Sequence, residues 1–145
     1  MHESTTAVEP QKRLEFWRAM TRSAFVELEI DAKTQAGFYG SLNSESLDDI
    51  QFTVVASTPQ HVRRTPALVR GSSSDDYLLS VQLRGRGIHK QDGRVASLHR
   101  GDFAIYDTTR PYEMLFGDPF SQLVLTLPRR LVCRRMPDPV GMTAR

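Results

Sequence analysis

The chain has 145 residues, of which 39% are hydrophobic and 25% are charged, and its formal net charge is +2. This length fits a single domain with a sizeable core, and so small a charge does not by itself indicate a nucleic-acid surface. The sequence has no apolar run of about 18 residues, which excludes a predicted membrane helix. Its single cysteine, Cys133, excludes an internal disulfide and fits a reducing compartment. Because the first residues also lack the features of a secretory signal, we expect a cytoplasmic globular protein.

Arginine strongly outnumbers lysine, with 16 arginines against three lysines. Arginine pairs well with phosphate, but these arginines are scattered along the chain in no more than local pairs such as Arg63-Arg64. A genome rich in arginine codons explains the bias equally well. The arginine content therefore does not predict direct nucleic-acid binding by this segment.

The pattern of apolar residues predicts one helix followed by many short strands. Residues 1–11 are polar and predict a flexible N-terminal arm. Between Gln11 and Ala24 the apolar residues are three and four apart, which predicts an amphipathic helix. Alternating or short apolar runs separated by turn residues then predict strands. We expect strands at 25–31, 37–42, 50–57, 61–65, 77–84, 88–91, 95–98, 103–106, 112–116 and 120–127.

The end of the chain predicts a short helix and then a linker. Pro128 suits the start of a helix over residues 129–136, and Pro137 and Pro139 end it. Short strands with turns every eight to twelve residues are typical of an all-β sandwich or barrel. The sequence therefore predicts a mainly β fold.

Several segments resemble a known family. The stretch from Asp76 to Gly87, followed by Gln91-Asp92-Gly93-Arg94 and by residues 98–102, is similar to a cupin barrel. The chain resembles more closely the N-terminal sensor domain of AraC/XylS-type transcription regulators. Further segments that carry this resemblance are Phe16-Trp17, residues 62–65, residues 106–112 and Leu127-Pro128-Arg129.

The resemblance covers residues 14 to 136 and implies a cupin-like double-stranded β-barrel (jelly roll) with a leading N-terminal helix and a short C-terminal helix. On this basis we expect an arm at 1–11, a sensor domain at 12–136 and a linker at 137–145. The resemblance further implies an effector-binding barrel joined to helix-turn-helix units, which these 145 residues do not contain. We therefore expect nucleic-acid contact only through a domain absent from this chain, no membrane partner, and possible homodimers.

Catalytic cupins hold a metal with histidines and a glutamate, and the glycine pattern places those positions on Ser72, Ser74, Leu78 and Tyr112. Serine, leucine and neutral tyrosine are poor ligands for zinc, iron or manganese. We therefore expect a barrel without metal or other cofactor, and we expect no enzyme activity.

An effector site follows from the same comparison. If Leu78 points inward, strand alternation places Ser80, Gln82 and Arg84 inward as well. A second inward row holds Tyr112, Met114 and Phe116. In sugar-sensing relatives an arginine directly before the glycine that corresponds to Gly85 faces the ligand, so the resemblance implies that Arg84 binds a carboxylate or a pair of hydroxyls.

Structural roles for the same residues remain open. The second row can simply fill the core, Gln82 and Arg84 can pair with Asp107, Glu113 or backbone, and Asp107 can clamp Arg110 across its own turn. The leading hypothesis is a domain that senses a small organic effector. The alternatives are a dimerisation module with a solid barrel, using Leu131, Val132 and Met136 or a sheet edge, and a metal-dependent cupin enzyme.

Overall fold

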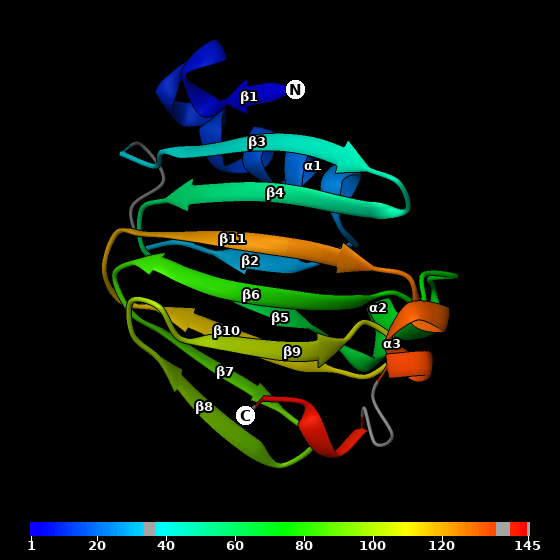
Figure 1. Cartoon of the computed structure of the whole chain (residues 1–145). Helices are drawn as coiled ribbons and strands as arrows, with labels where there is room; N and C mark the ends of the chain where they lie inside the picture. Colours follow the sequence, from blue (N-terminus) through cyan, green and yellow to red (C-terminus); the bar gives the residue numbers. More distant parts are fainter. Residues whose placement is uncertain (34–36, 136–139, 145) are drawn as a thin grey trace.

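The structure, a computed structural model, describes residues 1–33, 37–135 and 140–144. Two antiparallel sheets lie face to face, with the second sheet behind the first in Figure 1. The first sheet has the order β1 (His2–Ser4), β3 (Gly40–Leu47), β4 (Ile50–Ser57), β11 (Phe120–Leu127), β6 (Tyr77–Arg84) and β9 (Phe103–Asp107). The second has the order β2 (Glu29–Asp31), β5 (Gln60–Arg64), β10 (Tyr112–Phe116), β7 (Gly87–Gln91) and β8 (Arg94–Leu98).

The described residues also form three short α-helices and three 3-10 turns. They are η1 (Thr5–Ala7), η2 (Pro10–Lys12), α1 (Arg13–Ala24), α2 (Pro66–Arg70), α3 (Arg129–Arg135) and η3 (Val140–Met142). The fold class expected from the sequence is confirmed: the chain is mainly β, a cupin-like barrel of two antiparallel sheets with an N-terminal and a short C-terminal helix. In the part of the chain that the structure describes, no helix is long and apolar enough to cross a membrane.

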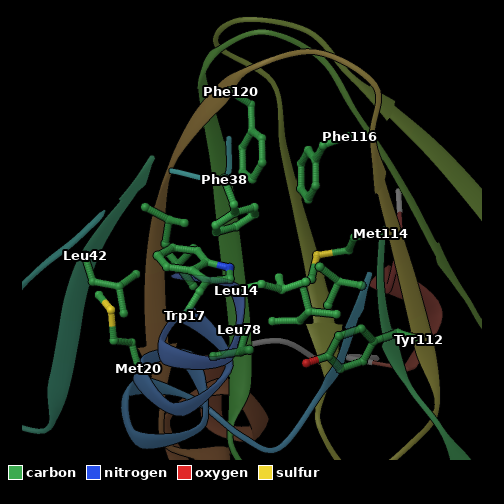
Figure 2. Packing of buried hydrophobic residues seen from close by; sticks show 14 of the residues in the cluster. Leu14, Trp17, Met20, Phe38, Leu42, Leu78, Tyr112, Met114, Phe116 and Phe120 are labelled. Atoms are coloured by element: carbon green, nitrogen blue, oxygen red, sulfur yellow. The ribbon is translucent and has the colours of Figure 1, made fainter. Parts of the chain in front are cut away.

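The main core lies between the two sheets because alternate residues of the strands point inward. In β10, Tyr112, Met114 and Phe116 are buried while the residues between them are partly exposed. They meet inward residues of the opposite sheet, such as Leu78 and Val124, in one apolar cluster. Figure 2 shows this cluster.

Helix α1 covers the space between the sheets with its apolar face, which includes Leu14, Trp17 and Met20. The Trp17 ring packs against Gly40 of β3, where an added Cβ would lie 2.4 Å from the ring. The Trp17 indole N–H donates to the side-chain oxygen of Gln60 in β5 at 2.8 Å. Trp17 therefore fastens α1 to both sheets at once.

The N-terminus differs from the expected flexible arm. Residues 2–4 form β1, which pairs with β3 at the edge of the six-stranded sheet. The side chain of Thr5 is fully buried and accepts a hydrogen bond from the Gly40 N–H at 3.0 Å. The segment that precedes α1 is thus attached to the same strand against which Trp17 packs.

The C-terminus also differs from the expected linker. Thr143 forms a parallel bridge with Ile105 of β9, and the Ala144 N–H donates to the Ile105 carbonyl at 2.9 Å. Arg94 donates to the Thr143 carbonyl at 2.8 Å. Residues 140–144 therefore lie against the barrel, whereas residues 137–139 of the expected linker lie outside the described residues.

Candidate functional site

A cavity lies between the sheets beneath α1. It has a volume of about 40 Å³, counted as the space that the centre of a water molecule can occupy. Its walls are mostly apolar and come from α1 and from strands of both sheets. The lining residues are Trp17, Thr21, Phe25, Leu28, Ile30, Val55, Gln60, Val62, Leu78, Tyr106, Tyr112, Met114, Phe116, Phe120, Gln122 and Val124.

The three expected ligand-binding residues of β10 all line this cavity. Tyr112 is 5% exposed, and Met114 and Phe116 are 8% and 4% exposed. In Figure 2 the Tyr112 hydroxyl points from β10 toward Leu78 on the opposite sheet. Among the described residues this hydroxyl has no hydrogen-bond partner. Burial, with a further contribution from the adjacent Tyr106, raises the pKa of Tyr112 well above its ordinary value of 10, so the hydroxyl keeps its proton.

Ser80 and Gln82 of β6 point inward as expected, and both are fully buried. Neither belongs to the cavity wall, and each takes part in a hydrogen bond. The Ser80 hydroxyl lies 2.7 Å from the Tyr106 hydroxyl. The Gln82 amide donates to the Arg84 carbonyl at 2.8 Å, which is the backbone pairing that the sequence left open.

The inward orientation predicted for Arg84 is wrong. Gln122 and Ser121 are adjacent in β11 but lie opposite Gln82 and Arg84 of β6, so Leu83 is an extra residue in a β-bulge. A shift of one residue turns the following side chain to the other face of the sheet. Arg84 is therefore exposed and does not line the cavity.

Behind the cavity, a buried polar chain links three strands. The Gln122 amide nitrogen donates to the Gln82 side-chain oxygen at 2.8 Å and lies 3.1 Å from His89 Nε2. His89 of β7 is 2% exposed, and burial lowers its pKa from 6.5 to about 4. His89 is therefore neutral at pH 7 and accepts the hydrogen bond from Gln122.

The comparison with catalytic cupins places four metal-ligand positions on this chain, and two of them face the cavity. Leu78 and Tyr112 line it, whereas Ser72 and Ser74 lie in the loop between α2 and β6. No group of three or more histidine, cysteine, aspartate or glutamate side chains suited to hold a metal occurs among the described residues. Cys133 is a free, exposed cysteine on α3.

Several polar or aromatic residues of the wall were not predicted from the sequence, and three of them, Trp17, Gln122 and Gln60, show why. Trp17 lies on the apolar face of the expected helix, and that position was the available signal. Gln122 interrupts an otherwise apolar inward row in β11, between Phe120 and Val124. Gln60 had no such signal, because its place in the wall depends on how β5 pairs with β10.

The turn after β9 connects the barrel to α3. The Asp107 carboxylate, whose side chain is fully buried, accepts from Arg110 at 2.8 Å and from Arg129 of α3 at 2.5 Å. The clamp of Asp107 and Arg110 across their own turn is therefore present. Burial alone would raise the pKa of Asp107, but hydrogen bonds from Arg129 and Thr109 hold it below its ordinary value. The Gln91 side chain donates to the Asp107 carbonyl at 2.7 Å and fixes the same turn from β7.

Residues 17–145 match the family described as the AraC-binding-like domain. The chain belongs to this family. This membership confirms the resemblance identified in the sequence.

Two relatives and one solved structure are similar to this AraC-binding-like domain. It is 39% identical over 128 residues to an uncharacterized protein in the nit 5'region of Bacillus sp. (strain OxB-1), covering 88% of this chain and 50% of that protein. It is 28% identical over 89 residues to the transcriptional activator NphR from Rhodococcus sp, covering 61% of this chain and 27% of NphR. The crystal structure of the AraC-like transcriptional activator CuxR matches with a TM-score of 0.83 at 20% identity, covering 97% of this chain and 51% of that chain. The domain thus spans about half the length of the relatives it matches, or less.

Proposed function

We propose that this AraC-binding-like domain senses a small organic effector inside its barrel and passes that binding on to transcription control. The observation that carries the proposal is the apolar cavity onto which the unpaired Tyr112 hydroxyl opens. Family membership and the similarity to AraC-like activators support the regulatory role. Contact with DNA would then require a helix-turn-helix domain outside these residues.

The size of the cavity indicates how binding would change the protein. A volume of about 40 Å³ holds roughly three water molecules. A larger effector must therefore displace part of the wall, and the covering helix α1 contributes Trp17 and Thr21 to that wall. Strand β1 and turn η1 are bound to β3, and Trp17 packs against Gly40 of the same strand. A shift of α1 would therefore also change how the N-terminal segment packs. A ligand changes such an equilibrium only when it binds the two arrangements with different affinities.

We infer that the site binds a ligand and does not catalyse a reaction on it. At the two cavity-facing positions where a catalytic cupin would carry a metal ligand, this chain has Leu78 and the protonated Tyr112. Neither side chain suits a divalent cation. The cavity wall in the described residues also has no carboxylate, histidine or cysteine that could act as acid, base or nucleophile.

A matched pair of substitutions tests the proposed effector site. Val124→Phe adds volume to the cavity wall, because Val124 is 4% exposed and points inward. Val95→Phe makes the same change at a position that is 63% exposed on β8. We expect compounds from a thermal-shift screen to raise the melting temperature of the wild type and of Val95→Phe, but not of Val124→Phe. Equal shifts in all three proteins, or no active compound at all, would contradict the proposal.

Association of two copies is a second candidate function, favoured by the outer face of the six-stranded sheet. Val54, Leu123, Val81 and Phe103 lie opposite one another on four neighbouring strands and form an apolar row. Phe103 is 59% exposed. If this row forms a dimer interface, light scattering will show a dimer that Phe103→Asp converts to a monomer.

The helix considered from the sequence is a weaker interface. Val132 is 5% exposed and packs against Tyr77 and Ile105 of the same chain, in a small hydrophobic cluster separate from the main core. Met136 lies outside the described residues.

A further inference from the structure

The charge of the cavity wall restricts which ligands it can take. The sixteen described lining residues include no arginine, lysine, histidine, aspartate or glutamate. Arg84, which the resemblance implied would bind a carboxylate or a pair of hydroxyls, lies outside the barrel because of the bulge at Leu83. Moving an ion from water into such an apolar space without a counter-ion is strongly unfavourable.

Arg64 is the buried cation nearest to Tyr112 in the sheet, since the two residues lie opposite each other in β5 and β10. It does not belong to the cavity wall. Its guanidinium donates to the Glu27 carbonyl at 2.9 Å and twice to the Thr108 carbonyl at 3.3 Å. Arg64 therefore ties two loops together. Its charge acts on Tyr112 and partly opposes the rise of the Tyr112 pKa, but Arg64 does not line the cavity wall.

One polar atom on the cavity wall lacks a partner in the described structure. The Tyr106 hydroxyl is paired with Ser80, and the Gln60 oxygen accepts from Trp17. The Tyr112 hydroxyl has no partner, although buried polar groups are paired in the great majority of cases. An unpaired buried hydroxyl is a ready hydrogen-bonding site for a ligand.

The rest of the wall is mainly apolar and combines aliphatic side chains with several aromatic rings. Phe116 and Phe120 stack with their centroids 3.7 Å apart, and the Tyr106 and Tyr112 rings lie 4.8 Å apart. Flat apolar walls favour a compact apolar or aromatic ligand. At about 40 Å³ the cavity must enlarge to hold even a single ring, and the proposal takes a shift of Trp17 as the movement that enlarges it.

We propose that the barrel selects a small uncharged molecule whose apolar body packs among the aromatic rings and whose single polar group hydrogen-bonds the Tyr112 hydroxyl. This inference rests on the proposed effector site and adds the chemical class of its ligand. Tyr112 is then a residue that determines specificity. It discriminates against pure hydrocarbons by the hydrogen bond. The wall discriminates against anions because no charged side chain lines it.

Three single-ring probes test the proposal by isothermal titration calorimetry. Phenol carries the polar group, toluene replaces it with a methyl group, and benzoate carries a charge. We expect phenol to bind about tenfold more tightly than toluene, which corresponds to the usual strength of one hydrogen bond. We expect benzoate to bind at least tenfold more weakly than phenol.

In the variant Tyr112→Phe, phenol and toluene should bind with about equal affinity. The substitution should also raise the melting temperature without ligand, because an unpaired buried hydroxyl is removed. The matched control is Tyr39→Phe, since Tyr39 is 41% exposed and lies outside the cavity wall. This control should keep the tenfold preference.

The outcomes separate the ligand class from the effector site itself. Equal affinities for phenol and toluene, or tight binding of benzoate, would overturn the ligand class while leaving a binding barrel in place. A preference that persists in Tyr112→Phe would overturn the assignment of Tyr112. Failure of all three probes to bind, with no change in the fluorescence of Trp17, the single tryptophan, would overturn the effector site as well.

Discussion

Replacing His89 with glutamine should remove a defined part of the acid-induced loss of stability. His89 is buried beside Tyr106 and Phe116, with ring centroids 5.6 Å and 5.9 Å away, and it accepts a hydrogen bond from Gln122. Protonation would place a positive charge among these rings and a donor against the Gln122 amide. Glutamine keeps a neutral hydrogen-bonding group in that position at every pH.

The magnitude follows from the shift of the His89 pKa from 6.5 to about 4. Because the folded-state pKa is the lower one, the unfolded chain binds the proton more readily. The contribution to stability is complete above pH 6.5 and is lost as the pH falls from 6.5 toward 4. At about 1.4 kcal/mol per pKa unit, the wild type should lose roughly 2–3 kcal/mol between pH 7.5 and pH 4.5 from this residue.

The assay is urea unfolding of both proteins at the two pH values. We expect the wild type to lose roughly 2–3 kcal/mol more than His89→Gln between them. The control His99→Gln changes a histidine whose side chain is 61% exposed and should behave as the wild type. Equal losses in the wild type and in His89→Gln would refute the assignment of this pH dependence to His89.

Two further substitutions test the turn and the helix contact. Asp107→Asn should destabilise the protein by about 2 kcal/mol, since it leaves Arg129 and its neighbours without their buried carboxylate. Because the Asp107 pKa lies below its ordinary value, the wild type should also lose stability as the pH falls below about 4, a loss that Asp107→Asn should lack, and urea unfolding against pH measures this difference. Gly40→Ala should cost about 1–3 kcal/mol by pushing the Trp17 ring away, whereas Gly117→Ala, with nothing within 4 Å, should be nearly neutral in thermal unfolding.

Local patterns were sufficient for the strands that carry the site. The predicted bounds of β6, β10 and β11 coincide with the observed ones. In β10 alternation also gave the correct orientation of Tyr112, Met114 and Phe116, because the strand pairs with both neighbours without a register shift. Inward and outward positions can be predicted wherever pairing is regular.

Arg84 shows where that reasoning stops. Alternation along β6 is correct to Gln82 and fails after it, because the bulge at Leu83 arises from pairing with β11. A bulge is a property of two strands together, so one strand's sequence does not reveal it.

Helix α2 was missed for a different reason. The Thr65 hydroxyl accepts from the Leu68 N–H at 3.2 Å, and Pro66 occupies the first turn, which together are a helix-start signal. The predicted strand at 61–65 ends directly before Pro66, and no helix was predicted to follow it. That helix could have been predicted.

The ends of the chain depend on long-range pairing. The polar residues of β1 carry no strand pattern, and β1 exists because β3 offers it an edge. Thr143 is likewise held by Ile105, which precedes it by 38 positions in the chain. Partners this distant cannot be inferred from local composition.

The indole N–H of Trp17 provides the most direct test of effector binding coupled to movement of α1. It gives a single indole resonance in the NMR spectrum of isotope-labelled protein, since the chain has one tryptophan, and it reports the hydrogen bond to Gln60. We predict a saturable shift of this resonance as phenol is added, with faster hydrogen exchange once the bond to Gln60 is broken. An unchanged indole resonance at phenol concentrations that saturate the calorimetric binding would contradict the account.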